Sequence, residues 1–124
     1  HGEPGWDEPT PCGPFELYDV TPGHVVRTER DPLDCGLARC TPQSLAGGDA
    51  AHNAAGMRAV FTGQDRGSHR DALVLNAALA LEVTGTVADP QAAIRAASDA
   101  LDRGDGARLL DRLATFGRSM GGAP

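Results

Sequence analysis

The chain has 124 residues, of which 40% are hydrophobic and 4% aromatic, and a formal net charge of −6. The length suits a single domain, and the apolar fraction excludes a disordered chain, so we expect a core of Ala, Leu and Val. The acidic balance argues against a nucleic-acid partner, and no apolar run approaches the roughly 20 residues of a membrane span. We therefore expect a cytoplasmic protein. The sequence does not begin with methionine, which suggests a fragment or a processed product.

Residues 1–14, the acidic loop, are rich in Gly, Pro and acidic residues. Four prolines there cannot donate to a strand ladder, so the segment is predicted to be a loop. Its adjacent carboxylates, Asp7 and Glu8, offer hard oxygen ligands of the kind that Mg²⁺ accepts, usually together with water and substrate phosphate. Spacing alone favours a solvated acidic turn over a metal site, and it leaves the Mg²⁺ site open as the alternative.

A β-hairpin is predicted over residues 15–30. Hydrophobic residues alternate from Phe15 to Val20, the run Thr21-Pro22-Gly23-His24 is typical of a turn, and a second strand follows over Val25 to Glu29. Residues 31–48 have no clear period and are predicted to be an irregular connector.

Residues 49–118 are predicted to be helical. Asp49 suits the N-cap of a helix over Ala50–Thr62, and Ser68 with Asp71 resembles a capping box for a helix over about His69 to Thr84. Asp89-Pro90 should begin a third helix that ends near Gly104, and Asp105 should cap a fourth. Residues 119–124 are predicted to be a frayed tail.

The second of these helices is apolar on nearly every side, so it should be the buried central helix of the domain. Few strands are available in the sequence to cover it. This mismatch predicts that the chain is incomplete as an α/β domain.

Other polar residues have ordinary structural explanations. The three cysteines, Cys12, Cys35 and Cys40, are predicted to be free thiols, with metal binding through sulfur as the minor alternative. The four histidines do not show a metal-ligand spacing. Asn76 should bond to backbone groups of a neighbouring connection, and Arg70 either holds a loop or faces water.

Four motifs occur in order and together resemble the C-terminal part of the anthranilate phosphoribosyltransferase family. The resemblance extends from His1 to about Leu113. The motifs are His1-Gly2-x-x-Gly5-x-Asp7-Glu8, Asp31-Pro32-x-Asp34-x-Gly36-Leu37, Gly47-Gly48-Asp49-Ala50-x-x-Asn53-Ala54 and Arg70-Asp71-x-x-x-x-Asn76-Ala77-Ala78.

This resemblance implies an α/β fold of the phosphoribosyltransferase and nucleoside-phosphorylase type, here reduced to a hairpin followed by about four helices. It also implies transfer of phosphoribose from phosphoribosyl pyrophosphate (PRPP) to anthranilate in tryptophan biosynthesis. In that family the Asp-Glu pair binds Mg²⁺ at the pyrophosphate, and those positions are Asp7 and Glu8 here. The family's glycine-rich pyrophosphate loop and its anthranilate-binding residues lie in an N-terminal portion absent from this sequence.

The chain alone is therefore expected to be inactive, and to need an N-terminal part or partner chain, with a homodimer as the complete form. Trp6 stands where the family commonly has a smaller aliphatic residue, and Cys35 where an aromatic residue is common. Three alternatives remain: a non-catalytic paralogue acting as a binding module, a purely structural subunit that completes a partner's core, and a related nucleoside phosphorylase. The Asp-Glu pair favours the anthranilate branch.

Overall fold

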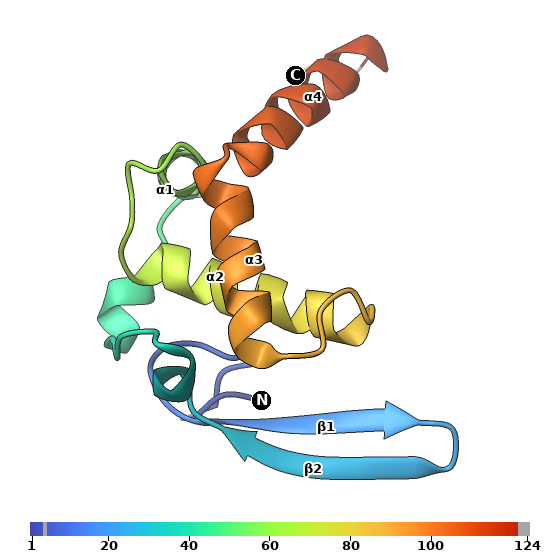
Figure 1. The fold of residues 1–124 in the computed structure, drawn as a ribbon. Coiled ribbons are helices and arrows are strands. Elements are labelled where there is room, and N and C mark those ends of the chain that lie inside the picture. Colours follow the sequence, from blue (N-terminus) through green and yellow to red (C-terminus); the bar gives the residue numbers. More distant parts are fainter. Residues whose placement is uncertain (4, 122–124) are drawn as a thin grey trace.

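The computed structural model describes residues 1–3 and 5–121. Along the chain, a two-stranded hairpin follows the acidic loop, two short 3-10 turns fill the connector, and four helices complete the order (Figure 1). This arrangement confirms the expected hairpin followed by four helices. The predicted tail lies partly outside the described residues, at positions 122–124.

The hairpin pairs β1 (Phe15–Thr21) with β2 (His24–Arg30) in antiparallel register, from Phe15 opposite Arg30 to Thr21 opposite His24. It extends away from the helices, and only its base, at Phe15, is buried (Figure 1). At that base Arg30 donates to Glu82 of the second helix at 2.8 Å, in a partly buried ion pair. The hairpin is thus attached to the body at one end only.

All four helices lie close to where the sequence places them. They are α1 (Ala50–Phe61), α2 (Ser68–Val83), α3 (Pro90–Asp102) and α4 (Asp105–Ser119). The Asp49 and Asp89 side chains accept hydrogen bonds from the backbone N–H groups of His52 and Ala92, as expected of N-caps.

Two predicted caps are wrong. The N-cap of α2 is Gly67, with no side-chain hydrogen bond, and Ser68 is already the first helical residue. The N-cap of α4 is Gly104, in the left-handed region, and Asp105 lies in the first turn. In both places an acidic residue stands in the first turn of the helix, where it still favours the positive end of the helix dipole.

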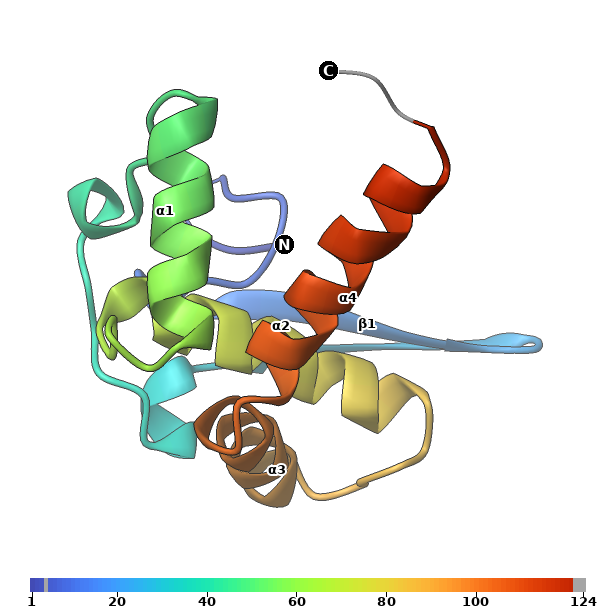
Figure 2. The same cartoon turned by 90° about the horizontal axis from the view of Figure 1, so that it is seen from above.

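The core forms where α2 and α3 cross, and the hairpin base and the connector close it from below (Figures 1 and 2). Its buried side chains are small and aliphatic apart from one ring: Phe15, Leu37, Val74, Leu75, Ala78, Ala93, Ile94 and Ala97. This agrees with the low aromatic content of the sequence.

The α2 helix is buried on one side only by the described residues. Val74 is fully buried, whereas Leu73 is 36% exposed and Val83 is 86% exposed. The α4 helix leads away from the body (Figure 2), and its Leu109, Leu113 and Phe116 are exposed. Among the described residues, no helix combines the length and apolar character needed to cross a membrane.

Candidate functional site

The acidic loop is ordered by a tight backbone turn at its start. The amide of Gly2 donates to the carbonyl of Trp6 at 3.0 Å, and the amides of Gly5 and Trp6 both donate to the carbonyl of Gly2 at 2.9 Å. Gly2 also forms an isolated bridge with Phe15, which joins this turn to the base of the hairpin. The loop therefore has a defined backbone immediately before Asp7 and Glu8.

Both glycines of the first motif have a steric reason. A Cβ on Gly2 would lie 2.9 Å from the carbonyl oxygen of Glu8 and 3.2 Å from the Cβ of Trp6, so the two ends of the turn approach too closely for any side chain. Gly5 has a φ of 109°, a backbone conformation that side-chain-bearing residues rarely adopt. The motif spacing thus encodes the turn that presents the acidic pair.

On its other side the acidic pair is anchored to α2. The Asn76 amide donates to the carbonyl of Pro9 and to the carbonyl of Ala72 in its own helix, both at 2.9 Å. This confirms the expectation that Asn76 bonds to a neighbouring connection. Thr10 is buried, and its hydroxyl accepts from the amide of Cys12 at 3.3 Å. The residues that follow Glu8 are therefore fixed to the helical body.

Asp7 and Glu8 themselves are exposed. Within the described residues, neither carboxylate takes part in an ion pair or accepts a side-chain hydrogen bond. Glu8 lines an open hollow of about 490 Å³, together with Trp6, Pro9, His69 and Asn76; Asp7 is not part of its lining. The pair is thus held by its backbone while its oxygen atoms face solvent.

Two free carboxylates suit Mg²⁺, which keeps several waters and takes one or two protein carboxylates together with phosphate oxygens. No group of three or more His, Cys, Asp or Glu side chains that could enclose a metal is found in the described part of the chain. Asp7 and Glu8 would supply one or two oxygen ligands to such a cation and leave the rest of its coordination to other groups. The donor set fits a substrate-bridging metal rather than a closed structural site.

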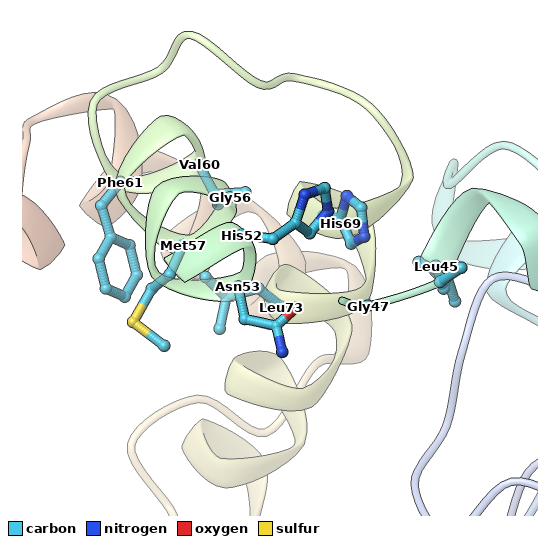
Figure 3. A pocket seen from close by; sticks show the side chains of 11 residues that line it. Leu45, Gly47, His52, Asn53, Gly56, Met57, Val60, Phe61, His69 and Leu73 are labelled. Carbon is cyan, nitrogen blue, oxygen red and sulfur yellow. The ribbon is translucent and has the colours of Figure 1, made fainter. Parts of the chain in front are cut away.

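A second hollow, of about 330 Å³, adjoins the first and shares Leu45, His69 and Leu73 with it. It lies between α1, the start of α2 and the connector, and both His52 and His69 line it (Figure 3). His69 also contacts Asp65, with 3.3 Å between Nδ1 and Oδ2. The sequence did not indicate that His52 and His69 line one hollow, because they come from different helices and are 17 positions apart.

The first and last residues of the connector motif, Asp31 and Leu37, both have structural roles. Asp31 accepts from the amide of Leu33 at 2.9 Å and begins a 3-10 turn (Pro32–Cys35), and Leu37 enters the core. Arg39 also donates to both oxygens of Asp31, at 2.7 and 2.8 Å. The Leu33 amide first, and then Arg39, lower the pKa of Asp31 below its usual range.

The start of α1 is closed by a reciprocal pair of hydrogen bonds. Asn53 accepts from the amide of Gly48 at 2.8 Å and donates to its carbonyl at 3.0 Å.

At the start of α2, Arg70 is largely buried and donates to Asp102 at 3.2 Å and to the carbonyl of Ser98 at 3.5 Å. Arg70 therefore joins α2 to the end of α3. The next residue, Asp71, is partly buried, and this burial raises the pKa of its carboxyl group.

The cysteines are free thiols, as expected. Cys12 of the acidic loop and Cys40 of the connector approach each other closely, with 3.5 Å between their sulfur atoms. Cys35 packs separately against the core. The sequence indicated the thiols but not the contact, because 28 positions separate the two residues that meet.

Comparison with known proteins agrees with these motifs. Residues 1–107 match the family model described as "Glycosyl transferase family, a/b domain". The chain is 38% identical to an anthranilate phosphoribosyltransferase of Rubrobacter xylanophilus, over 98% of this chain and 36% of that protein. It is 43% identical to anthranilate phosphoribosyltransferase 2 of Streptomyces coelicolor, over 92% of this chain and 34% of that protein.

The fold is similar as well. The crystal structure of anthranilate phosphoribosyltransferase from Thermus thermophilus superposes with a TM-score of 0.82 at 28% identity, over 95% of this chain and 34% of that chain. The family resemblance inferred from the motifs and the α/β fold class are thereby confirmed. The chain spans about a third of the length of the relatives it matches.

Proposed function

Because the chain belongs to the glycosyl transferase family with an α/β domain, we propose that it is the C-terminal, metal-binding portion of an anthranilate phosphoribosyltransferase. The complete enzyme would transfer phosphoribose from PRPP to the amine of anthranilate. This chain would contribute the acidic loop and the helices that support it. The similarity of both relatives named above supports the reaction.

One observation carries the proposal. Several residues of the four motifs have a structural role near the acidic pair: Gly2 and Gly5 form the turn before it, and Asn76 bonds to the backbone after it. Asp7 and Glu8, in contrast, are both exposed, and neither carboxylate has a hydrogen-bond or ion-pair partner among the described side chains. A segment that is rigid in its backbone and holds two free carboxylates is suited to a ligand rather than to stability.

Asp7 and Glu8 would hold Mg²⁺ at the pyrophosphate of PRPP. When bound, the cation would offset the negative charge that develops on the departing diphosphate. The chain's own contribution is positional. Asn76 and the Gly2 turn hold the backbone on both sides of the pair, so the backbone that carries the carboxylates would need little reorganisation when the substrate arrives.

The remaining two thirds of the enzyme would cover the face that carries the two hollows. Leu45 and Leu73 line both hollows, Glu8 lines the first, and the exposed Met57 lines the second. Contiguous apolar surface beside a candidate site is typical of an interface. Covering it would also bring the phosphate- and anthranilate-binding residues of the other portion to the metal.

A reconstitution experiment tests this proposal. The chain is mixed with the portion of the Streptomyces coelicolor relative that lies outside the matched segment, and loss of anthranilate fluorescence is followed with PRPP present. We expect consumption that depends on Mg²⁺ from the mixture and none from either part alone. A mixture that associates on size-exclusion chromatography yet stays inactive would contradict the assignment.

A double substitution of the acidic pair locates the metal. Asp7→Asn with Glu8→Gln should lower the activity of the mixture by about 100-fold or more, because several kcal/mol of charge stabilisation are lost. Both side chains are exposed, so the thermal midpoint should barely move. Glu3→Gln with Asp19→Asn removes the same charge at two other exposed positions and should leave the activity unchanged.

The same variants separate the alternative functions. A purely structural subunit or a non-catalytic binding module would be indifferent to loss of the acidic pair. A nucleoside phosphorylase would consume a pyrimidine nucleoside with phosphate rather than anthranilate with PRPP.

We further propose that the complete enzyme is a cytoplasmic homodimer that binds neither nucleic acid nor membrane, which sedimentation and cell fractionation would test.

A further inference from the structure

The sulfur atoms of Cys12 and Cys40 lie 3.5 Å apart, although the residues come from different segments. Cys12 lies four positions after Glu8, and Cys40 lies near the middle of the connector. Both side chains are partly buried and both are free thiols. This contact is the one place among the described residues where two thiols meet.

The backbone holds the two residues together independently of the sulfur atoms. The amide of Cys40 donates to the carbonyl of Pro11 at 3.1 Å, next to Cys12 in the chain. The amide of Cys12 in turn donates to the buried Thr10 hydroxyl. A disulfide needs its sulfur atoms about 2.05 Å apart, so they would have to approach by about 1.5 Å, within the reach of small side-chain rotations.

We propose that Cys12 and Cys40 form a redox modification site, which a small-molecule disulfide such as oxidised glutathione converts into an intramolecular disulfide. One cysteine, as thiolate, attacks the oxidant and releases one glutathione; the other attacks the resulting mixed disulfide and releases the second. The two protein thiols lose two protons and two electrons in total, and the oxidant becomes two thiols. This proposal is independent of the reaction that the acidic loop serves.

The disulfide would join the acidic loop covalently to the connector. It would close a covalent ring from residue 12 to residue 40, enclosing the hairpin and the first 3-10 turn. Because the hydrogen bond from Cys40 to Pro11 already exists, the ring would retain the present arrangement and leave Asp7 and Glu8 exposed. Burial is the main cause that raises the pKa of Cys40, so less thiolate is present and this thiol should react slowly.

Peptide mapping can test the pairing directly, because trypsin separates the three cysteines. Cleavage after Arg27, Arg30, Arg39 and Arg58 places Cys12, Cys35 and Cys40 on three different peptides. The chain is equilibrated in glutathione buffers of defined ratio, starting from both the reduced and the oxidised protein, and free thiols are then blocked. We expect the Cys12 and Cys40 peptides to be joined, with a mass 2 Da below their sum, and Cys35 to remain free.

Three variants keep the outcome decisive. Cys35→Ser should leave the linked peptide unchanged, whereas Cys12→Ser and Cys40→Ser should each abolish it. In the Cys35→Ser chain, oxidation should raise the thermal midpoint by about 10 °C, as a ring of this length predicts. Links to Cys35, links only between chains, or two free thiols in the most oxidising buffer would each overturn the proposal.

Discussion

In the helix pair α2–α3 the contacts are aliphatic and buried, whereas the acidic loop is ordered by backbone hydrogen bonds and two sterically required glycines. The first region excludes water and supplies stability in proportion to the apolar area it buries. The second region buries little, but it sets the path of a few residues closely. Asn76 connects the two, since it stands on α2 and bonds to Pro9.

This difference explains where a charged catalytic group can be placed with little loss of hydration free energy. Carboxylates inside the helix pair would need partners to compensate for their burial, whereas those on the loop remain solvated and free to bind a cation. Stability and ligand binding are therefore located in separate residues. Substitutions in the two regions should have different signatures, and three of them test this; a fourth, in the connector, provides a weaker comparison.

The largest effect is expected from Leu75→Ala in the helix pair. Leu75 is 3% exposed and belongs to the core, so the truncation should lower the free energy of unfolding by about 2–5 kcal/mol in urea titrations. Leu109→Ala, at a position 52% exposed on α4, is the matched control and should change it by about 0.5 kcal/mol or less. Equal losses at both positions would mean that the core is elsewhere.

Gly2→Ala should disturb the loop without dissolving the helix pair. The added Cβ would meet the Glu8 carbonyl at 2.9 Å, and we expect a loss of about 1–3 kcal/mol in the same titration. Gly117→Ala, on α4 with open space around it, should instead stabilise the chain by about 0.5–1 kcal/mol. If both alanines stabilised, the close turn at Gly2 would be refuted.

Asn76→Ala should separate the loop from the helix. Removing the amide deprives the Pro9 carbonyl of its donor, which should cost about 1–2 kcal/mol and speed hydrogen exchange of the amides at residues 2–12. Asn53→Ala removes the same side chain at the start of α1, where it bonds to Gly48, and should leave exchange in the acidic loop unchanged. Identical exchange in the two variants would contradict the anchoring role.

The smallest effect is expected at Asp31. Its pKa is lowered in the folded chain, so its charge contributes stability above about pH 4, and this contribution is lost as the pH falls through the lowered value. Asparagine retains the capping geometry. The stability difference between the wild-type chain and Asp31→Asn should therefore shrink below pH 4 in thermal unfolding, and a difference constant from pH 2 to 7 would contradict the charge effect.

Local signals in the sequence were sufficient for most elements. Pro22 and Gly23 mark the hairpin turn, and Asp49 and Asp89 mark two helix starts, because caps and turns depend on residues a few positions apart. The starts of α2 and α4 were misplaced by one residue, since a capping box and a first-turn acidic residue share the same local pattern. The adjacent acidic pair could be singled out for the same local reason.

The sequence by itself determined the hairpin, the helices, the family and the pair of carboxylates, all of which depend on short-range patterns. Only the tertiary structure decided that Asn76 holds Pro9, that Cys12 meets Cys40, and that His52 and His69 share one hollow. The residues concerned lie 17 to 67 positions apart in the sequence. No periodicity or motif specifies them, because they follow from how α1, α2 and the loops pack around the core.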